Sequence, residues 1–165
     1  MGSALSYGLV VLVAYVIMEF VAWASHRWLM HGWLWSWHAD HHKPKYQKKG
    51  FWEKNDLFFI VFAIPSMFSY IIGSLYADYR WLLFVGIGIS LYGLTYFLIH
   101  DVYIHQRFRW FGHLDNKFSR AILKAHGNHH AVHTKEGCES FGLLVVEPKY
   151  FKKNSERRAM EDVKK

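Results

Sequence analysis

Three long apolar segments alternate with polar, histidine-rich stretches along this chain. Residues 4–24 contain one charged side chain, Glu19, and residues 57–76 and 81–99 contain none. About 20 predominantly apolar residues are enough for a helix to cross the hydrocarbon core of a bilayer. The pattern therefore predicts three transmembrane helices.

The second and third segments are separated by residues 77–80 alone, and a turn this short predicts a transmembrane hairpin. Its two outer ends then lie on the same side of the bilayer as the end of the first span. All twelve histidines fall between residues 26 and 133, outside the spans, and therefore on that one side. We predict an all-α integral membrane protein, a single domain over 1–165, with a helical histidine-rich metal domain at one end and a charged tail at 152–165.

The charge distribution predicts which side this is. The chain is 52% hydrophobic with a formal net charge of +7, and nineteen of its twenty lysines and arginines lie on the histidine side, with Arg80 opposite. Basic residues concentrate in cytoplasmic loops, so the histidine side is predicted to be cytoplasmic. Lysines here are expected to contact anionic headgroups, and we expect no nucleic-acid partner.

The histidines repeat one two-part pattern, HxxxxH followed by HxxHH. Ten of them belong to the two copies: His26, His31, His38, His41, His42, His100, His105, His126, His129 and His130. If residues 37–43 are helical, HxxHH presents a single multidentate face, whereas the five-residue spacing of HxxxxH would place its members on either side of a site. Imidazole suits iron, zinc, copper and nickel. Ten ligands exceed the needs of one ion, so we predict two ions with about five histidines each.

Two histidines fall outside this pattern, and three carboxylates lie near it. His113 and His133 are expected to be surface or supporting residues. Glu19, Asp40 and Asp101 adjoin the ligands and are candidates to hydrogen-bond the far ring nitrogens. Alternatively, Glu19 reaches the membrane interface and each aspartate is a helix cap or a solvated charge. The single cysteine of the chain excludes an internal disulfide and a cysteine-based metal site.

Two other classes of membrane protein place histidines near membranes. A metal transporter would need ionisable groups near the middle of its spans, and the hairpin helices have none. A b-type cytochrome needs only one axial histidine on each face of the haem, for which HxxHH supplies too many. The pattern favours a histidine-only centre that reacts with a lipid-soluble substrate.

Several stretches resemble the fatty acid hydroxylase superfamily of membrane histidine-box di-iron oxygenases, and within it the bacterial β-carotene 3-hydroxylases. The similar stretches are HRWLMHGWLWSWHADHHKP, FWEKNDLF, LYGLTYFLIHDVYIHQRF, KAHGNHHAV and KEGCESFG, which cover most of residues 18–142. The histidine pattern is shared by sterol, sphingolipid and alkane oxygenases. The intervening motifs HDVYIHQRF and GCESFG narrow the resemblance to the bacterial β-carotene 3-hydroxylases within this superfamily.

This resemblance implies two non-haem iron ions held by the ten patterned histidines, O2 as oxidant, and electrons from NAD(P)H by way of ferredoxin and its reductase. It implies hydroxylation of β-ionone rings at C3 and C3′, which converts β-carotene to β-cryptoxanthin and then zeaxanthin. It also implies a multi-pass protein of the bacterial cytoplasmic (inner) membrane. A related oxygenase that acts on a sterol, an acyl lipid or a ketocarotenoid is the alternative.

Overall fold

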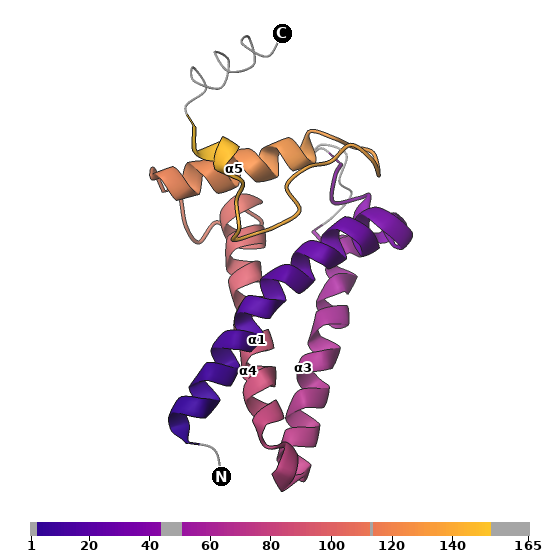
Figure 1. Cartoon of the computed structure of the whole chain (residues 1–165). Helices are drawn as coiled ribbons and strands as arrows, with labels where there is room; N and C mark the ends of the chain where they lie inside the picture. The colour runs from indigo at the N-terminus through magenta and orange to yellow at the C-terminus, as the bar shows by residue number, and fades with distance from the viewer. Residues whose placement is uncertain (1–2, 44–50, 113, 153–165) are drawn as a thin grey trace.

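The computed structural model describes residues 3–43, 51–112 and 114–152. Within these ranges every regular element is helical (Figure 1). The three long helices are α1 (Ala4–Ala24), α3 (Phe58–Leu75) and α4 (Trp81–Tyr96). A fourth, α5 (Lys117–His130), lies across one end of this bundle. The predicted all-α architecture is confirmed.

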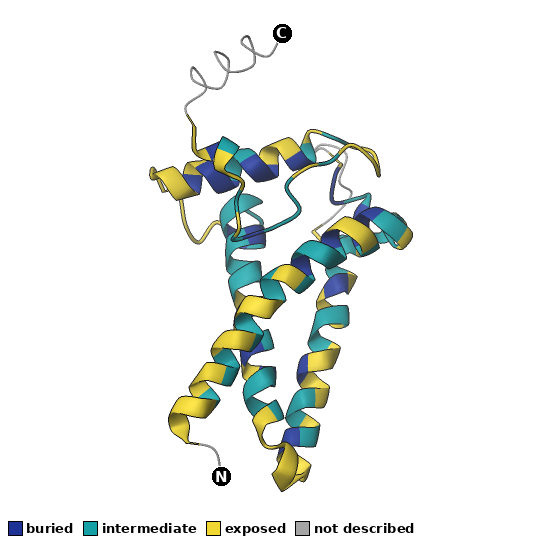
Figure 2. Ribbon diagram, viewed as in Figure 1, coloured by how far each residue is buried: buried dark blue, intermediate teal, exposed yellow. Residues whose placement is uncertain are grey.

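Three stretches of the described chain are long and apolar enough to cross a membrane. They are Ala4–Trp33, Lys54–Leu75 and Trp81–Ile104. Most of their side chains are not buried within the protein; Leu9, Phe59 and Leu94 are among the exposed ones (Figure 2). Exposed apolar surface of this extent is unfavourable in water and favourable in the hydrocarbon of a bilayer. The three predicted spans are confirmed, and the chain is a multi-pass membrane protein.

Glycines set the close packing of α4 against its two neighbours. A Cβ at Gly88 would lie 2.6 Å from the carbonyl oxygen of Val11 on α1, and one at Gly73 on α3 would lie 2.6 Å from the amide nitrogen of Leu83. In lipid, where the hydrophobic effect does not drive helices together, small residues allow backbones to approach and gain van der Waals contact. This packing positions the ends of α1 and α4 side by side.

The helices α1 and α4 both continue into π-helical segments, and these carry the HxxxxH motifs. The first segment is Ser25–Trp33, which is kinked at Gly32 after His31, and the second is Phe97–Ile104, with His105 at its C-cap. The hairpin turn between α3 and α4 lies at the far end of the bundle, as does the N-terminus (Figure 1). All ten patterned histidines therefore lie at one end.

The first HxxHH motif departs from the expected helix over residues 37–43. The short helix α2 (Trp35–His38) ends at its first histidine, and His41 and His42 follow in turns. One bond, from the amide of His41 to the carbonyl of His38 (3.0 Å), holds the first of these turns. The second HxxHH motif does lie on a helix, at the end of α5.

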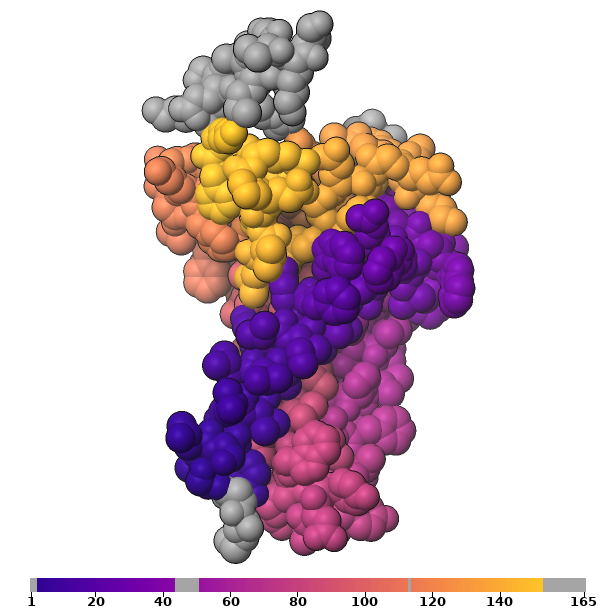
Figure 3. All heavy atoms as spheres, viewed as in Figure 1, coloured from indigo at the N-terminus to yellow at the C-terminus, as the bar shows by residue number. Residues whose placement is uncertain are grey.

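After α5 the chain folds back along α1, as the yellow segment in Figure 3 shows. It ends in a short 3-10 helix, Pro148–Phe151, where buried Tyr150 packs on Ala121 and Ala125 of α5. Residues 44–50, His113 and the tail beyond residue 152 lie outside the described residues. This returning segment supplies several contacts to the histidines.

Candidate metal centre

The π-helical segments bring the two histidines of each HxxxxH motif onto one face. In a π-helix the backbone hydrogen bond joins residues five apart, and the amide of His105 donates to the carbonyl of His100 at 2.9 Å. The ring centroids of His26 and His31 lie 5.3 Å apart, and those of His100 and His105 lie 4.5 Å apart. The expectation that these pairs would lie on either side of a site is wrong, because it assumed α-helical periodicity.

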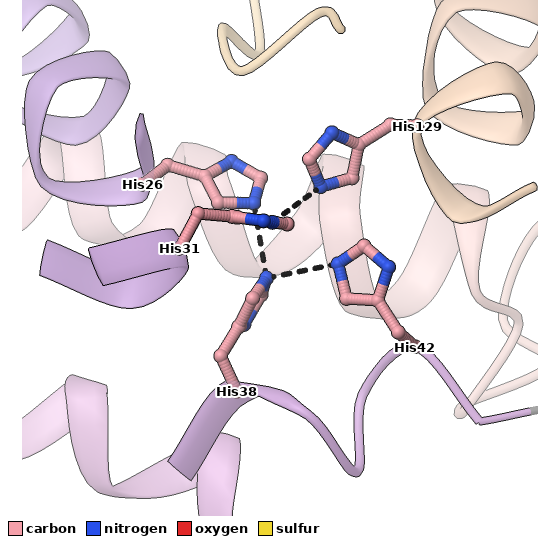
Figure 4. Close-up of side chains that lie close together, drawn as sticks. All are labelled: His26, His31, His38, His42 and His129. Atoms are coloured by element: carbon pink, nitrogen blue, oxygen red, sulfur yellow. Dashed lines mark hydrogen bonds between the residues drawn. The ribbon is translucent and has the colours of Figure 1, made fainter. Parts of the chain in front are cut away.

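Nine of the ten patterned histidines form two groups whose ligand nitrogens lie within 4.8 Å of one another. The first cluster is His26, His31, His38, His42 and His129 (Figure 4). The second is His41, His105, His126 and His130. His100 adjoins the second group, since its Nε2 lies 3.1 Å from Nε2 of His41, and we include it in the second cluster. The structure thus brings the ten patterned histidines together in two adjoining clusters of five, and the binding of one ion by each cluster stays a prediction.

Each HxxHH motif is divided between the two clusters. His41 belongs to the second cluster and its neighbour His42 to the first; His129 belongs to the first and His130 to the second. The rings of His42 and His130 stack with centroids 4.6 Å apart, so the two clusters are in direct contact. The expectation that HxxHH offers one face to one site is therefore wrong.

Main-chain carbonyls fix the orientation of most first-cluster rings. Four Nδ1–H groups donate in this way: His26 to Phe141 (3.0 Å), His31 to Lys135 (3.1 Å), His42 to Val132 (2.8 Å) and His129 to Glu139 (2.8 Å). A carbonyl oxygen can only accept, so the proton of each neutral ring sits on Nδ1. The Nε2 lone pairs consequently point into the cluster.

These inward lone pairs meet one another with no proton between them. Nε2 of His38 lies 3.1 Å from Nε2 of both His26 and His42, and Nε2 of His31 lies 3.2 Å from that of His129 (Figure 4). Two imidazole nitrogens bound at about 2.1 Å to one ion, at a right angle, lie about 3.0 Å apart. The spacing thus fits a shared metal ion.

The surroundings of the two clusters keep the imidazoles neutral, so added protons do not supply the positive charge that the converging lone pairs would attract. Burial and the neighbouring imidazoles lower the pKa of His129 to about 3, and burial also lowers the pKa of His38 to about 2. Burial likewise holds the pKa values of His41 and His126 well below 6.5. Nε2 of His130 is buried, and no described group hydrogen-bonds it. Neutral imidazoles with free, converging lone pairs are what a divalent ion requires.

Carboxylates hold two rings of the second cluster. Nδ1 of His100 lies 3.2 Å from Oδ2 of Asp101, the partner that the sequence led us to expect. Nδ1 of His41 lies 2.8 Å from Oε2 of Glu53, a residue that the sequence analysis missed and whose side chain is 8% exposed. Glu53 lies twelve residues after its histidine, in a separate element, so no short motif connects the two.

The other two candidate carboxylates have different partners. Glu19 accepts from the amides of Leu143, Leu144 and Val145 and from the Tyr92 hydroxyl, so it holds the returning segment and not a histidine. One oxygen of Asp40 accepts from the Lys54 amide at 2.7 Å. Its other oxygen is buried, with no described hydrogen-bond donor.

His133 is exposed and belongs to neither cluster.

A cleft of about 1300 Å³ lies between α1, α5 and residues 135–149. Val16 and Phe20 on its α1 side are exposed on the apolar surface of the first span. Its inner lining includes His126 of the second cluster and Phe141, whose ring lies 5.2 Å from those of His31 and His129. The border where α1 meets the returning segment is seen in Figure 3. The cleft thus extends from the lipid-facing surface of α1 to His126 of the second cluster, and Phe141 separates it from the first cluster.

Together, the fold and the site define a multi-pass membrane metalloprotein whose metal centre is built from histidines. Comparison with known protein families identifies the family of membrane metalloproteins to which the chain belongs. The chain belongs to the fatty acid hydroxylase family, whose family model matches residues 11–147. This family is one of oxygenases with a metal centre, and the chain is accordingly an oxidoreductase of the monooxygenase type.

Curated relatives carry consistent names. The chain is 42% identical to "Beta-carotene hydroxylase" of Pantoea ananas, over 85% of this chain and 77% of that protein. It is 37% identical to a protein of the same name from Paracoccus sp. (strain N81106 / MBIC 01143), over 85% and 84% respectively. It is 37% identical to "Beta-carotene 3-hydroxylase 2, chloroplastic" of Arabidopsis thaliana, over 71% of this chain and 38% of the plant protein. No solved structure matches the chain.

Proposed function

We propose that this protein hydroxylates β-carotene-type carotenoids at C3 and C3′ of the β-ionone rings, yielding β-cryptoxanthin and then zeaxanthin. The single observation that carries the proposal is the pair of adjoining histidine clusters beside a cleft that opens on the lipid-facing side of α1. The names of the curated relatives supply the substrate class.

Each cluster is proposed to hold one iron ion through its Nε2 atoms. Iron bound there would activate O2, so that one oxygen atom enters a C–H bond of the substrate and the other leaves as water. The protein orients the rings through their Nδ1–H donors and keeps them neutral by burial. We propose that the two electrons required for each hydroxylation come from NAD(P)H through ferredoxin and its reductase.

The cleft explains how an uncharged hydrocarbon would reach the metal. β-Carotene dissolves in the hydrocarbon of the bilayer. Val16 and Phe20 border the cleft and are exposed on α1, within the first membrane span. The cleft has a volume of about 1300 Å³, above the usual 300–1,000 Å³ of ligand pockets, which leaves room for a terminal ring and the adjoining part of the polyene. We propose that this ring lies near His126 and Phe141, which line the cleft.

Expression of the chain in cells that accumulate β-carotene tests the proposal directly. We expect zeaxanthin and β-cryptoxanthin to appear, and one oxygen atom of labelled O2 to enter each new hydroxyl group. Unchanged carotene together with oxygenation of a sterol, an acyl lipid or a ketocarotenoid would assign the chain another substrate.

A pair of α1 variants tests the route to the site. Val16→Trp would fill the mouth of the cleft, and we expect kcat/KM to fall at least tenfold, the equivalent of about 1.4 kcal/mol. Val13→Trp is the matched control, because Val13 lies one turn earlier, is also exposed, and is not among the lining residues. Equal effects of the two variants would place substrate entry elsewhere.

We further propose that the metal-bearing end faces the cytoplasm in the bacterial inner membrane. The basic residues on that end support this orientation through the positive-inside rule. A green fluorescent protein fused to the C-terminus would then fluoresce, since it folds on the cytoplasmic side. An alkaline phosphatase fused at the same point, which is active only outside the cytoplasm, should remain inactive.

A further inference from the structure

The two clusters differ in the groups that hold their rings. Main-chain carbonyls hold four rings of the first cluster, and His38 Nδ1 lies 2.7 Å from the side-chain oxygen of Asn55. In the second cluster the described partners of Nδ1 are carboxylates, Glu53 for His41 and Asp101 for His100. A charged acceptor makes an imidazole a stronger electron donor than a neutral one does. The two metal sites are therefore chemically unequal.

Arg107 joins the two carboxylate arms. Its guanidinium donates to both oxygens of Asp56 (2.6 and 2.9 Å) and to Oδ1 of Asp101 (2.8 Å). Asp56 in turn accepts from the amide of Glu53 at 3.0 Å, in a reciprocal capping box at the start of the 3-10 helix Lys54–Leu57. These hydrogen bonds fix the backbone from which Glu53 reaches its histidine.

The contacts form a closed ring of six residues. It runs through His41, Glu53, Asp56, Arg107, Asp101 and His100, and it closes where the Nε2 atoms of the two histidines lie 3.1 Å apart. Arg107 also donates to the carbonyl of Phe51 (2.8 Å) and lies 4.9 Å from the centre of its ring. The hydrogen bonds to Asp56 and Asp101 raise the pKa of Arg107, so its charge is permanent.

We propose that Arg107 is a positioning residue that acts mainly on the second cluster. It bonds Asp101, the partner of His100, directly, and through Asp56 it holds the backbone from which Glu53 reaches His41. The same 3-10 helix carries Asn55, the partner of His38, so we expect a smaller effect on the first cluster. The inference rests on the proposed two-ion centre and deepens it, because it makes one ion separately dependent on a residue that ligates neither. A planar guanidinium supplies donors to two carboxylates in fixed directions, which an ammonium group does not.

The test uses purified full-length protein loaded with iron. In Arg107→Met we expect one of two irons to become labile, with affinity for that iron reduced about 10–100-fold, the usual effect of losing a partner of a ligating histidine. The release rate of the other iron should change much less, because His38 is the one first-cluster histidine with a described partner on this 3-10 helix. Arg107→Lys, which keeps the charge but not the fork, should give an intermediate loss.

Iron content, release to a chelator and Mössbauer spectra report on the two sites without any carotenoid. Reference spectra of His100→Ala and His26→Ala identify the signals of the second and first clusters. Arg120→Met is the matched control, since Arg120 pairs with Asp115 on the exposed surface and contacts neither cluster. We expect this variant to retain both irons.

Two results would overturn the proposal: unchanged release of both irons from Arg107→Met, or equal loss of both from protein with unchanged helix content. If the Arg107→Met protein does not accumulate, iron release is measured on Asp101→Asn instead. This variant removes the charge of the carboxylate that joins Arg107 to His100 while keeping the shape of the side chain. Selective loss of one iron would support the inference even if no carotenoid were hydroxylated. Hydroxylation by the unmodified chain without selective loss would leave the proposed function standing and reject the role of Arg107.

Discussion

Replacing Glu19 tests how the returning segment is held against α1. One oxygen of its carboxylate accepts from three consecutive amides, those of Leu143 (3.0 Å), Leu144 (2.8 Å) and Val145 (3.0 Å). The other accepts from the Tyr92 hydroxyl at 2.7 Å. A hydrogen bond to a charged group contributes about 1.5–3 kcal/mol. Because the three amides share one oxygen and their contributions are not additive, we take about 3 kcal/mol for the set.

In Glu19→Ala these amides lose their acceptor, and the segment should open locally more often. At about 1.4 kcal/mol for each tenfold change, a loss of about 3 kcal/mol corresponds to roughly 100-fold faster hydrogen exchange at residues 143–145. Exchange measured by mass spectrometry on the protein in detergent micelles reports this change. We expect amides within α3 to exchange as before.

Glu147→Ala is the control, because Glu147 lies on the same segment but is exposed and pairs with Lys149 on the surface. Its effect on exchange at residues 143–145 should stay within a few-fold. Unchanged protection in Glu19→Ala would refute the reasoning that this carboxylate anchors the segment. The same segment carries Phe141, whose carbonyl orients His26, so we also expect hydroxylase activity to fall in Glu19→Ala.

Four further outcomes are expected. His41→Ala should lose metal from the second cluster and abolish activity, whereas His133→Ala, at an exposed position outside both clusters, should retain both; iron analysis and product assay check this. Tyr92→Phe removes one donor to Glu19 and should lower stability by about 1.5–3 kcal/mol, measured by thermal unfolding in detergent. Metal-free protein should be less stable at pH 5 than at pH 7, since His38 and His129 have folded pKa values of about 2 and 3 against 6.5 when unfolded. The unfolded chain then binds more protons than the folded chain below pH 6.5, so the free energy of unfolding falls with pH, by at most about 2 kcal/mol for each histidine at pH 5. Unfolding monitored by tryptophan fluorescence at the two pH values measures this loss. Removing metal with a chelator should lower Tm, and adding iron back should restore it.

The spans and the ligand set were predictable because each depends on a local property of the sequence. Hydrophobic length alone identifies a membrane helix, and the structure places α1 at Ala4–Ala24 and α3 at Phe58–Leu75, within one residue of the predicted bounds. The repeated motifs singled out ten histidines because neutral imidazole is a nitrogen ligand that suits transition metals, and the structure brings these ten side chains together. These inferences required no knowledge of which segments meet.

The orientation of the rings was not predictable, because their partners come from distant parts of the chain. The carbonyl of Phe141 lies 115 residues from His26, and that of Lys135 lies 104 residues from His31. A carbonyl acceptor has no side-chain signature, so no motif marks it. The partners of Glu19 were not predictable for the same reason. Its charge within the first span suggested a hydrogen bond to a ligating histidine, but it accepts from backbone amides of the returning segment and from the Tyr92 hydroxyl.

The π-helical segments and the divided HxxHH motifs together explain why five-residue and adjacent spacings occur in the same chain. A π-turn places residues five apart on one face, so each HxxxxH pair enters a single cluster. Adjacent histidines instead point in different directions, so each pair supplies one ligand to each cluster. Consecutive Cα atoms are about 3.8 Å apart, a distance set by covalent geometry. The two dipeptides, at residues 41–42 and at residues 129–130, therefore join the two clusters covalently and keep them adjacent.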